Sequence, residues 1–288
     1  MTSFISLPLL LGPLSHFIQL STPRTEWRPH PPPSTPCIVV PLYIYPLSGA
    51  WDSIFESARA NPHVSFIVIV NPCNGPGPDP FPDSSYAANL SRLGKLGNVV
   101  PLGYVHCSYG DRPVADVERD IGIYLGWNEK FRVDGIFFDE APSSAEGIPL
   151  MAGLAQFTRS RWQHDTGRTG LVVLNPGVVV DPGYYEHADH IVVFEQSEQH
   201  WNEYFTTQAV AQIPSHLSAK AVAMVHSCLG DAASLARQIG ELGFGGLYLT
   251  DQLGGGYNRW PDSWSLIIDE VGRAREPHVG SGASGEAA

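Results

Sequence analysis

Asp-Gly-Ile-Phe-Phe-Asp-Glu at residues 134–140 is an apolar run that ends on two carboxylates. A second run, His-Ile-Val-Val-Phe-Glu at residues 190–195, ends on one carboxylate. Continuous apolar runs of this length are typical of β-strands that are covered on both faces. Carboxylates are rarely left at the end of such a strand, because removing them from water is costly. The two runs therefore suggest acid/base or glycosidic chemistry, provided that the two strands meet in the fold.

The same alternation extends over most of the chain. Eight apolar runs of strand length occur, at residues 38–43, 64–71, 99–105, 134–139, 170–175, 190–195, 221–226 and 246–251. Segments with apolar residues every three or four positions predict helices at residues 51–60, 84–96, 113–131, 145–163, 231–242 and 264–275. Only residues 176–189 connect the fifth and sixth runs, so a helix there has room for about two turns.

This order of elements predicts an α/β fold, namely a single-domain (β/α)8 TIM barrel with parallel strands. An open doubly wound sheet would carry a glycine-rich phosphate turn after its first strand. The chain has Tyr-Pro-Leu-Ser-Gly-Ala at residues 45–50, which is no such turn. The barrel is therefore the favoured architecture.

The two ends of the chain differ in composition from the rest. Residues 1–36 are rich in proline, and we expect a mobile leader there, followed by the barrel at 37–276 and a disordered tail at 277–288. The apolar stretch at 6–14 is broken by Pro8 and Pro13, and no basic residue precedes it. It makes a poor secretory signal and is too short to span a bilayer, although an atypical export signal stays open.

Composition excludes some classes of partner. The formal net charge of −12 argues against binding to nucleic acid, which requires a basic face, and it suits uncharged or cationic polymers. None of the four cysteines has the spacing of a zinc site, so no metal and no cofactor are expected. Cys73 and Cys107 each follow an apolar run, and either a disulfide between them or free thiols is compatible with the sequence.

Polar residues gather at the carboxyl ends of the predicted strands, where active sites of such barrels lie. They are Tyr43, Tyr45, Asn71, His106, Asp139, Glu140, Asn175, Glu195, His226, Asp251 and Gln252. Asn71, Asn175 and Asp251 could equally cap turns, and the two histidines could be satisfied core residues. Asp139 and Glu140 are harder to explain structurally, because neighbouring carboxylates repel each other.

Aromatic residues lie in or beside the same predicted loops. They are Tyr43, Tyr45, Trp51, Tyr86, Tyr104, Tyr109, Trp201, Tyr257 and Trp260. Flat apolar faces beside polar groups suit sugar rings, although ordinary loop packing uses aromatic residues as well. Residues 251–260, with three consecutive glycines, predict a flexible loop over the mouth of the barrel.

Several of these stretches together resemble the spherulin-4-like proteins, which are grouped as glycoside hydrolase family 135. They are Val-Pro-Leu-Tyr-Ile-Tyr-Pro at 40–46, Val-Asn-Pro at 70–72, Gly-Pro-Gly at 75–77, Gly-Tyr-Val-His at 103–106, the run at 134–140, Leu-Asn-Pro-Gly at 174–177 and Ile-Val-Val-Phe-Glu at 191–195. The resemblance covers residues 38–275. It implies a TIM barrel that cleaves α-1,4-linked N-acetylgalactosamine within galactosaminogalactan, a fungal polysaccharide.

The resemblance also implies roles for residues. The family's acidic trio falls on Asp139, Glu140 and Glu195. Substrate contacts are expected from Tyr43, Tyr45, Asn71, His106, Tyr109, Asn175, His226 and Asp251. A monomer is expected, and many relatives look exported or membrane-anchored, which suggests secretion or the cell wall in spite of the poor signal.

Glycoside hydrolysis requires one carboxylic acid to protonate the leaving oxygen and a second carboxylate as nucleophile or base. In an α-linked 2-acetamido sugar the acetamide lies cis to the leaving group and cannot attack from behind. Our hypothesis is that Asp139 is the nucleophile and Glu195 the general acid/base. Glu140 would then hydrogen-bond the sugar or hold Asp139 ionised through a bridging partner, and Asp139 and Glu140 could exchange roles.

Three other functions are compatible with the same residues. One is a glycosidase that acts on another amino-polysaccharide. The second is a catalytically idle barrel that binds glycan in a cell wall or spore. The third is a metal-dependent hydrolase in which His106, Asp139, Glu195 and His226 converge, although the chain has neither an HxH nor an HExxH pair.

Overall fold

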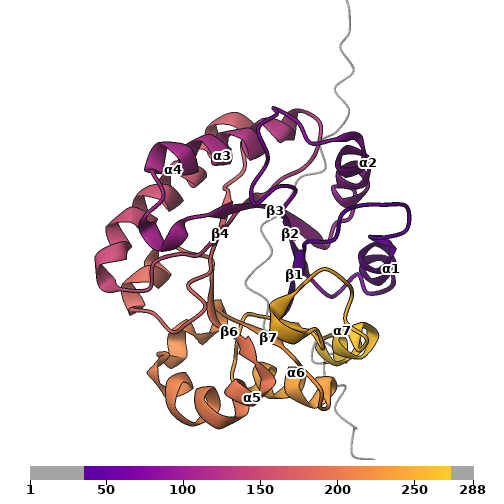
Figure 1. Cartoon of the computed structure of the whole chain (residues 1–288), viewed down its shortest axis with the longest axis vertical. Coiled ribbons are helices and arrows are strands. Elements are labelled where there is room, and N and C mark those ends of the chain that lie inside the picture. The colour runs from indigo at the N-terminus through magenta and orange to yellow at the C-terminus, as the bar shows by residue number, and fades with distance from the viewer. Residues whose placement is uncertain (1–35, 274–288) are drawn as a thin grey trace, which may run out of the picture. The chain divides into compact units, whose positions relative to one another are not determined.

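Eight parallel strands close into a barrel in the computed structural model, which describes residues 36–273. Figure 1 shows the strands around a central axis with the helices outside them. The strands are β1 (Cys37–Leu42), β2 (Phe66–Val70), β3 (Val99–His106), β4 (Gly135–Asp139), β5 (Leu171–Leu174), β6 (His190–Ser197), β7 (Ala221–His226) and β8 (Gly246–Leu249). Each strand pairs with the next in the chain, and β8 pairs with β1 to close the ring. The predicted (β/α)8 barrel is confirmed.

The predicted helices are confirmed, with ends that differ by a few residues. They are α1 (Asp52–Ala60), α2 (Ser84–Leu93), α3 (Val114–Gly126), α4 (Ile148–Thr166), α6 (Ala232–Glu241) and α7 (Trp264–Arg273). Between β5 and β6 the chain forms only the short 3-10 helix η4 (Pro182–Glu186), as the length of that connection predicted. Further 3-10 turns are η1 (Ser108–Gly110), η2 (Trp127–Glu129), η3 (Ala145–Gly147) and η8 (Leu253–Gly255).

The connection between β6 and β7 is helical, which the sequence did not predict. It consists of α5 (Glu198–His200), the π-helix η5 (Trp201–Ala209) and the 3-10 helices η6 (Val210–Gln212) and η7 (Ser215–Lys220). The rings of Trp201 and Phe205 stack at 4.7 Å, and Phe244 packs against both. These tertiary contacts stabilise a segment whose threonines have low helix propensity.

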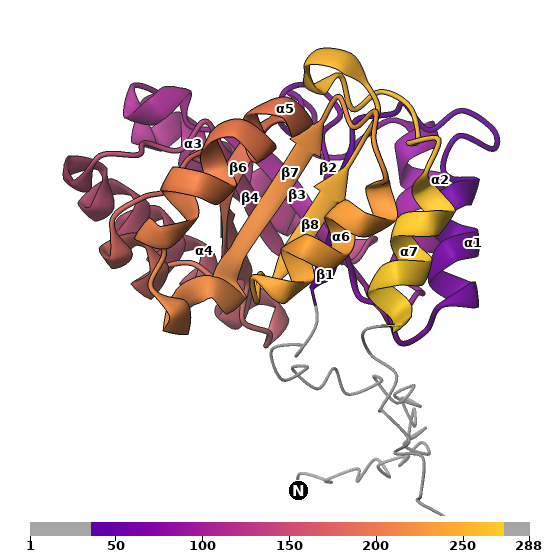
Figure 2. The same cartoon turned by 90° about the horizontal axis from the view of Figure 1, so that it is seen from below.

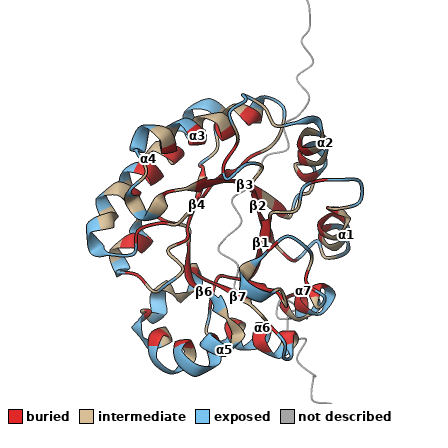
Figure 3. Cartoon of the chain, in the orientation of Figure 1, coloured by how far each residue is buried: buried red, intermediate tan, exposed pale blue. Residues whose placement is uncertain are grey.

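Burial explains why the strands read as continuous apolar runs. All residues of β1 and β2 are buried, since one face lines the barrel and the other lies under helices. Figure 3 shows the strands in the colour of buried residues and the outer faces of the helices in the colour of exposed ones. The buried residues of α6 recur every three or four positions and are Ala232, Leu235, Ala236 and Ile239.

Parallel pairing in chain order brings all the carboxyl ends of the strands to one end of the barrel. In Figure 2 the arrowheads of β7 and β8 point to the same side. The loops that follow the strands therefore surround a single mouth. The polar residues that the sequence places at the strand ends belong to this mouth.

The remaining structural predictions have different outcomes. All four cysteines are free thiols, with Cys73 exposed and Cys107 buried, so the disulfide alternative is not realised. Within residues 36–273 no helix is long and apolar enough to cross a bilayer. The predicted leader, apart from residue 36, and the predicted tail lie outside the described residues.

Gly103 in β3 provides a test of this packing. A Cβ at this position would lie 2.3 Å from a ring carbon of Tyr124, which is buried and donates its hydroxyl to the carbonyl of Val70. We expect Gly103→Ala to lower the free energy of unfolding by about 1–3 kcal/mol, because the core has no space for the methyl group. Gly122→Ala in α3 is the matched control, since nothing lies within 4 Å of its Cβ and alanine favours helices. Urea unfolding measures the stability of both variants. Equal stability of Gly103→Ala and Gly122→Ala would contradict this packing.

Candidate active site

One side-chain amide joins the two acidic strand ends. Asn175, which follows β5, donates from Nδ2 to Asp139 Oδ1 at 2.7 Å and to Glu195 Oε2 at 2.6 Å. Asp139 ends β4 and Glu195 lies in β6, so three neighbouring strands supply the three groups. Asn175 is only 5% exposed. The two carboxylates that the sequence singled out therefore meet at the mouth of the barrel, on either side of a buried amide.

A bulge in β6 precedes Glu195. The register with β7 pairs Val192 with Val222 and Phe194 with Ala223, so Val193 is an extra residue. Side chains of a strand alternate between faces, and one extra residue shifts that alternation. The bulge thus turns Glu195 to the face on which it meets Asn175.

Two tyrosines complete the hydrogen bonding of the carboxylates. Tyr104 in β3 donates to Asp139 Oδ2 at 2.6 Å, and Tyr257 in the loop after β8 donates to Glu195 Oε1 at 2.9 Å. The ring of Tyr43 lies edge-on to both, at 5.7 Å from Tyr104 and 6.1 Å from Tyr257. Every oxygen of the two carboxylates thus accepts a hydrogen bond from an uncharged donor.

Burial and charge shift the pKa values of this cluster. Burial raises the pKa of Glu195 above its ordinary value, and the charge of Asp139 raises it as well, while the hydrogen bonds from Asn175 and Tyr257 oppose the rise. Burial and the nearby carboxylates also raise the pKa values of Tyr43, Tyr104 and Tyr257, which stay protonated and able to donate. A carboxyl group with a raised pKa next to a second carboxylate is the arrangement of an acid/base pair.

Glu140 lies in a strained turn directly after Asp139. Its φ of 49° is in the left-handed region, and its carbonyl accepts a hydrogen bond from the Tyr109 amide at 2.7 Å. The carboxylate of Glu140 makes no hydrogen bond or ion pair with other residues in the described part of the chain. It is half-buried and remains available to a ligand.

Strained backbone is concentrated around the mouth. All the non-glycine residues with positive φ in residues 36–273 follow β2, β3, β4, β7 or β8, and they are Asn74, Ser108, Tyr109, Glu140, Ser227 and Tyr257. Each such residue costs about 1–3 kcal/mol and tends to mark a functional site. No other non-glycine residue within residues 36–273 adopts this conformation.

Some predicted substrate-binding residues have structural partners. Asn71 Oδ1 accepts the amide of Gly75 at 2.9 Å, so this side chain caps a turn. Asp251 binds Arg259 and accepts the amide of Asp262 at 3.0 Å, which holds the loop after β8 together. Their contact with substrate stays a prediction.

Other residues that the sequence predicted as substrate contacts also lie at the mouth of the barrel. His106 pairs with Asp139 in the register of β3 and β4, and its Nδ1 lies 3.0 Å from the carbonyl oxygen of Asn74. His226 Nδ1 lies 2.9 Å from the hydroxyl of Ser227. Tyr45 donates to Asp83 and is 48% exposed, and Tyr109 is 68% exposed.

The sequence predicted Tyr104 and Tyr257 only as aromatic residues in or beside the rim loops, and not as partners of the carboxylates. Tyr104 precedes His106 by two positions in β3, so the alternation of the strand could have placed both on one face. Tyr257 reaches Glu195 from a loop 62 residues away, and no local pattern indicates this contact. No group of three or more metal-binding side chains occurs within residues 36–273, so the metal site considered for His106 and His226 is not formed there.

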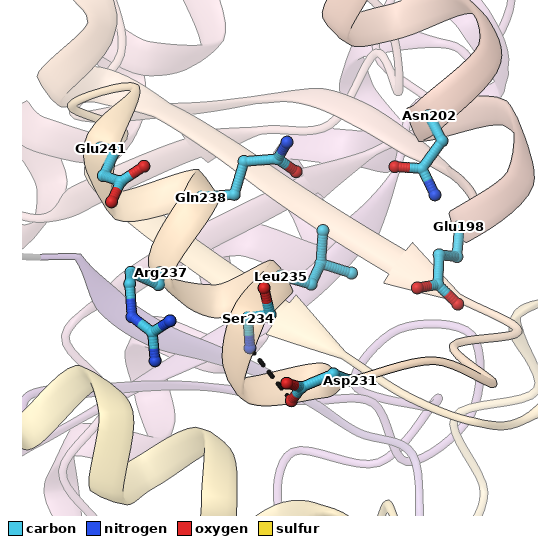
Figure 4. A pocket seen from close by; sticks show the side chains of 8 residues that line it. All are labelled: Glu198, Asn202, Asp231, Ser234, Leu235, Arg237, Gln238 and Glu241. Carbon is cyan, nitrogen blue, oxygen red and sulfur yellow. Dashed lines mark hydrogen bonds between the residues drawn. The ribbon is translucent and has the colours of Figure 1, made fainter.

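A separate pocket lies on the outer side of the barrel, between the helical segment after β6 and α6, with a volume of about 500 Å³. Figure 4 shows the polar side chains that line it. Glu198 accepts two backbone amides of the loop after β7, at 2.9 and 3.1 Å, and Asp231 caps α6. These carboxylates hold local structure, and the pocket does not include the pair at the barrel mouth.

Comparison with known proteins places the chain in a family context. Residues 37–271 match the family model of spherulation-specific family 4. Spherulin-4 of Physarum polycephalum is 34% identical over 226 residues, which is 76% of this chain and 64% of that protein, so the match spans less than two thirds of that relative. Sph3 of Aspergillus clavatus, crystallised in complex with GalNAc, is 30% identical with a TM-score of 0.74, over 83% of this chain and 98% of Sph3.

A chitinase from Bacteroides thetaiotaomicron has the same fold at 10% identity, with a TM-score of 0.50 over 85% of this chain and 99% of the chitinase. At this level of identity the similarity shows the fold alone. The family implied by the sequence motifs is therefore confirmed by the family model, by spherulin-4 and by Sph3.

The raised pKa of Glu195 predicts a pH-dependent stability. The folded protein holds this proton more tightly than the unfolded chain, so the wild type loses stability as the pH rises from the ordinary value of 4.5 through the raised value. Glutamine cannot ionise, and its oxygen can accept from Asn175 as Glu195 does. The free energy of unfolding of Glu195→Gln, relative to that of the wild type, is therefore expected to be higher at pH 7 than at pH 4. Urea unfolding of both proteins at the two pH values measures this difference. Glu186→Gln, at an exposed site, controls for the loss of one charge. If this variant gains as much stability at pH 7 as Glu195→Gln does, the burial of Glu195 is not the cause.

Proposed function

This chain belongs to spherulation-specific family 4, and we propose that it is a glycoside hydrolase that cleaves α-1,4-linked N-acetylgalactosamine within galactosaminogalactan-type polysaccharides. The family resemblance that implies this substrate includes the two strand ends that carry Asp139 and Glu195. GalNAc bound in the crystal structure of Sph3 supports the choice of sugar. The net charge of −12 suits a neutral or partly deacetylated, cationic polymer.

The observation that carries the proposal is the amide nitrogen shared by the two carboxylates. Hydrogen bonds of 2.7 and 2.6 Å meet at Asn175 Nδ2, so Asp139 Oδ1 and Glu195 Oε2 lie at most about 5.3 Å apart. Carboxyl groups of retaining glycosidases lie about 5–5.5 Å apart, whereas those of inverting enzymes lie about 6.5–9.5 Å apart to admit a water. The short separation supports a retaining reaction.

The first step has Asp139 as nucleophile and Glu195 as acid. Glu195 gives its proton to the glycosidic oxygen while the bond from that oxygen to the anomeric carbon breaks, and a carboxylate oxygen of Asp139 bonds to that carbon. In the second step a water gives its proton to Glu195 and attacks the anomeric carbon, which releases Asp139. The acetamide of an α-linked substrate lies cis to the leaving group, so the nucleophile has to come from the protein.

The surrounding residues support these assignments. Tyr104 and Asn175 donate hydrogen bonds to both oxygens of Asp139, which hold its carboxylate in a fixed orientation as a nucleophile requires. The pKa of Glu195 is raised by burial, as an acid requires. Glu140, with its unengaged carboxylate, is then assigned to the hydroxyl or acetamide groups of the sugar rather than to the reacting carbon.

Assay of the purified protein tests the function. We expect release of reducing ends from partly deacetylated galactosaminogalactan, with the α-anomer formed first, and a fall in kcat of about 10²–10⁴-fold in Glu195→Gln. Proton NMR of early products reports the anomer. Wild-type activity in Glu195→Gln would refute the acid/base assignment, and activity only on another polysaccharide of the panel would replace the substrate. Glycan binding without turnover would establish the idle barrel instead.

Rescue by azide distinguishes the two candidates for the nucleophile. In Asp139→Ala, azide can occupy the space of the lost carboxylate and attack an aryl α-glycoside, so we expect a β-glycosyl azide and release of the phenol. Glu140→Ala retains the nucleophile and is expected to raise KM without forming the azide. Mass spectrometry and NMR identify the glycosyl azide and its anomer. If only Glu140→Ala forms the azide, Glu140 is the nucleophile and Asp139 is not.

A further inference from the structure

The two hydrogen bonds on Glu195 differ in kind. Oε2 faces the Nδ2 amide of Asn175, which can only donate. Oε1 faces the hydroxyl of Tyr257, which can donate or accept. A proton on Oε2 would displace the amide hydrogen, whereas a proton on Oε1 requires only that the tyrosine hydrogen bond reverse its direction. Oε1 is therefore the oxygen that can carry a proton without setting two donor hydrogens against each other.

We propose that Tyr257 is a positioning residue that keeps the acid/base proton of Glu195 on Oε1 and reverses its own hydrogen bond each time this proton leaves or returns. The proposal rests on the glycosidase reaction given above, in which Glu195 first loses its proton to the glycosidic oxygen and then regains one from water. When Glu195 is ionised, the hydroxyl of Tyr257 donates to Oε1. When Glu195 is protonated, the same hydroxyl accepts from Oε1.

Each carboxyl group of the pair has its own tyrosine. The hydroxyl of Tyr104 lies 2.6 Å from Asp139 Oδ2, and the hydroxyl of Tyr257 lies 2.9 Å from Glu195 Oε1. Both rings lie edge-on to Tyr43, so the two hydroxyl groups belong to one cluster of rings.

Contacts independent of Glu195 fix the place of Tyr257. Its backbone is left-handed, with φ of 44°, and its side chain is buried. The ring packs edge-on against Tyr43 and Tyr248, at 6.1 and 5.8 Å. The next residue, Asn258, is held by two hydrogen bonds to Gln252, at 2.6 and 3.1 Å. The loop after β8 therefore positions the hydroxyl of Tyr257 through contacts that do not involve the carboxylate of Glu195.

Few charged groups face Glu195. Asp139 faces it from β4, and the tyrosines 43, 104 and 257 face it from the end of β1, from β3 and from the loop after β8. No lysine or arginine in residues 36–273 forms an ion pair with Glu195 or with Asp139. The position of the proton is thus decided by neutral hydrogen bonds beside one negative charge.

Titration of Glu195 tests the proposal without any substrate. The protein is labelled with ¹³C at the side-chain carboxyl carbon of glutamate, and the signal of Glu195 is identified by its loss in Glu195→Gln. Loss of the hydroxyl in Tyr257→Phe removes a donor to the ionised form, so we expect the pKa of Glu195 to rise by about one unit. Tyr248→Phe makes the same chemical change in the neighbouring ring and is expected to leave the pKa in place. No rise in Tyr257→Phe, or an equal rise in both variants, would overturn the proposal.

Kinetics on the same variants separate this role from the function itself. In Tyr257→Phe we expect the high-pH limb of the kcat/KM profile to shift to higher pH, as the pKa of Glu195 does. We expect kcat on the polymer to fall about tenfold. The fall should be smaller on a nitrophenyl glycoside, whose leaving group needs little protonation. If kcat falls equally on both substrates and the high-pH limb of the profile does not shift, Tyr257 has only a packing role. A wild type that cleaves no glycan would refute the proposed function, while the titration would still show whether the hydroxyl of Tyr257 sets the pKa of Glu195.

Discussion

A single amide nitrogen shared by two carboxylates is the contact on which the mouth of this barrel depends. Asn175 donates to Asp139 and to Glu195, and it can do so only because β4, β5 and β6 are neighbours in register. Two half-buried carboxylates without a donor between them would repel each other, which disfavours ionisation of both. The amide lowers this repulsion without contributing a charge, so that one group can ionise while the other keeps its proton.

The geometry around that amide is maintained at a cost in stability. Glu195 is turned inward by an extra residue in β6, and Glu140 and Tyr257 hold left-handed backbone angles. A continuous core of strand and helix residues offsets this cost, since both faces of the strands are covered. Strain is confined to the loops that follow the strands, where the core does not depend on it.

The sequence predicted the barrel well, because apolar periodicity is a local property that each strand and helix shows by itself. It also predicted that Asp139 and Glu195 lie on one rim, because counting strands fixes which ends meet. The β6 bulge was not predictable, since an extra residue in an apolar run leaves the run apolar. The helical connection after β6 was missed although its buried residues Trp201, Phe205 and Ala209 recur every four positions. The residues between them are mostly polar, and packing against distant Phe244 stabilises the segment.

Hydrogen-bond partners of the carboxylates could be predicted only in part. Asn175 was expected at the rim, but its position between the carboxylates depends on side-chain geometry that a pattern does not contain. Tyr257 comes from a glycine-rich loop that reads as flexible, yet Gln252 and Asn258 fix it in place. The resemblance to a known family placed Glu140 in the expected acidic trio and left open whether Asp139 or Glu140 is the nucleophile.

Uncharged donors have a chemical consequence that a salt bridge would not have. A guanidinium or ammonium group between Asp139 and Glu195 would favour the ionised form of both and would remove the acid at neutral pH. Amide and hydroxyl groups stabilise a carboxylate less, so burial and the charge of Asp139 still raise the pKa of Glu195. Of these donors only a hydroxyl can also accept. In the proposed reaction the proton of Glu195 leaves and returns in each cycle, and the loop after β8 supplies a tyrosine hydroxyl opposite Oε1.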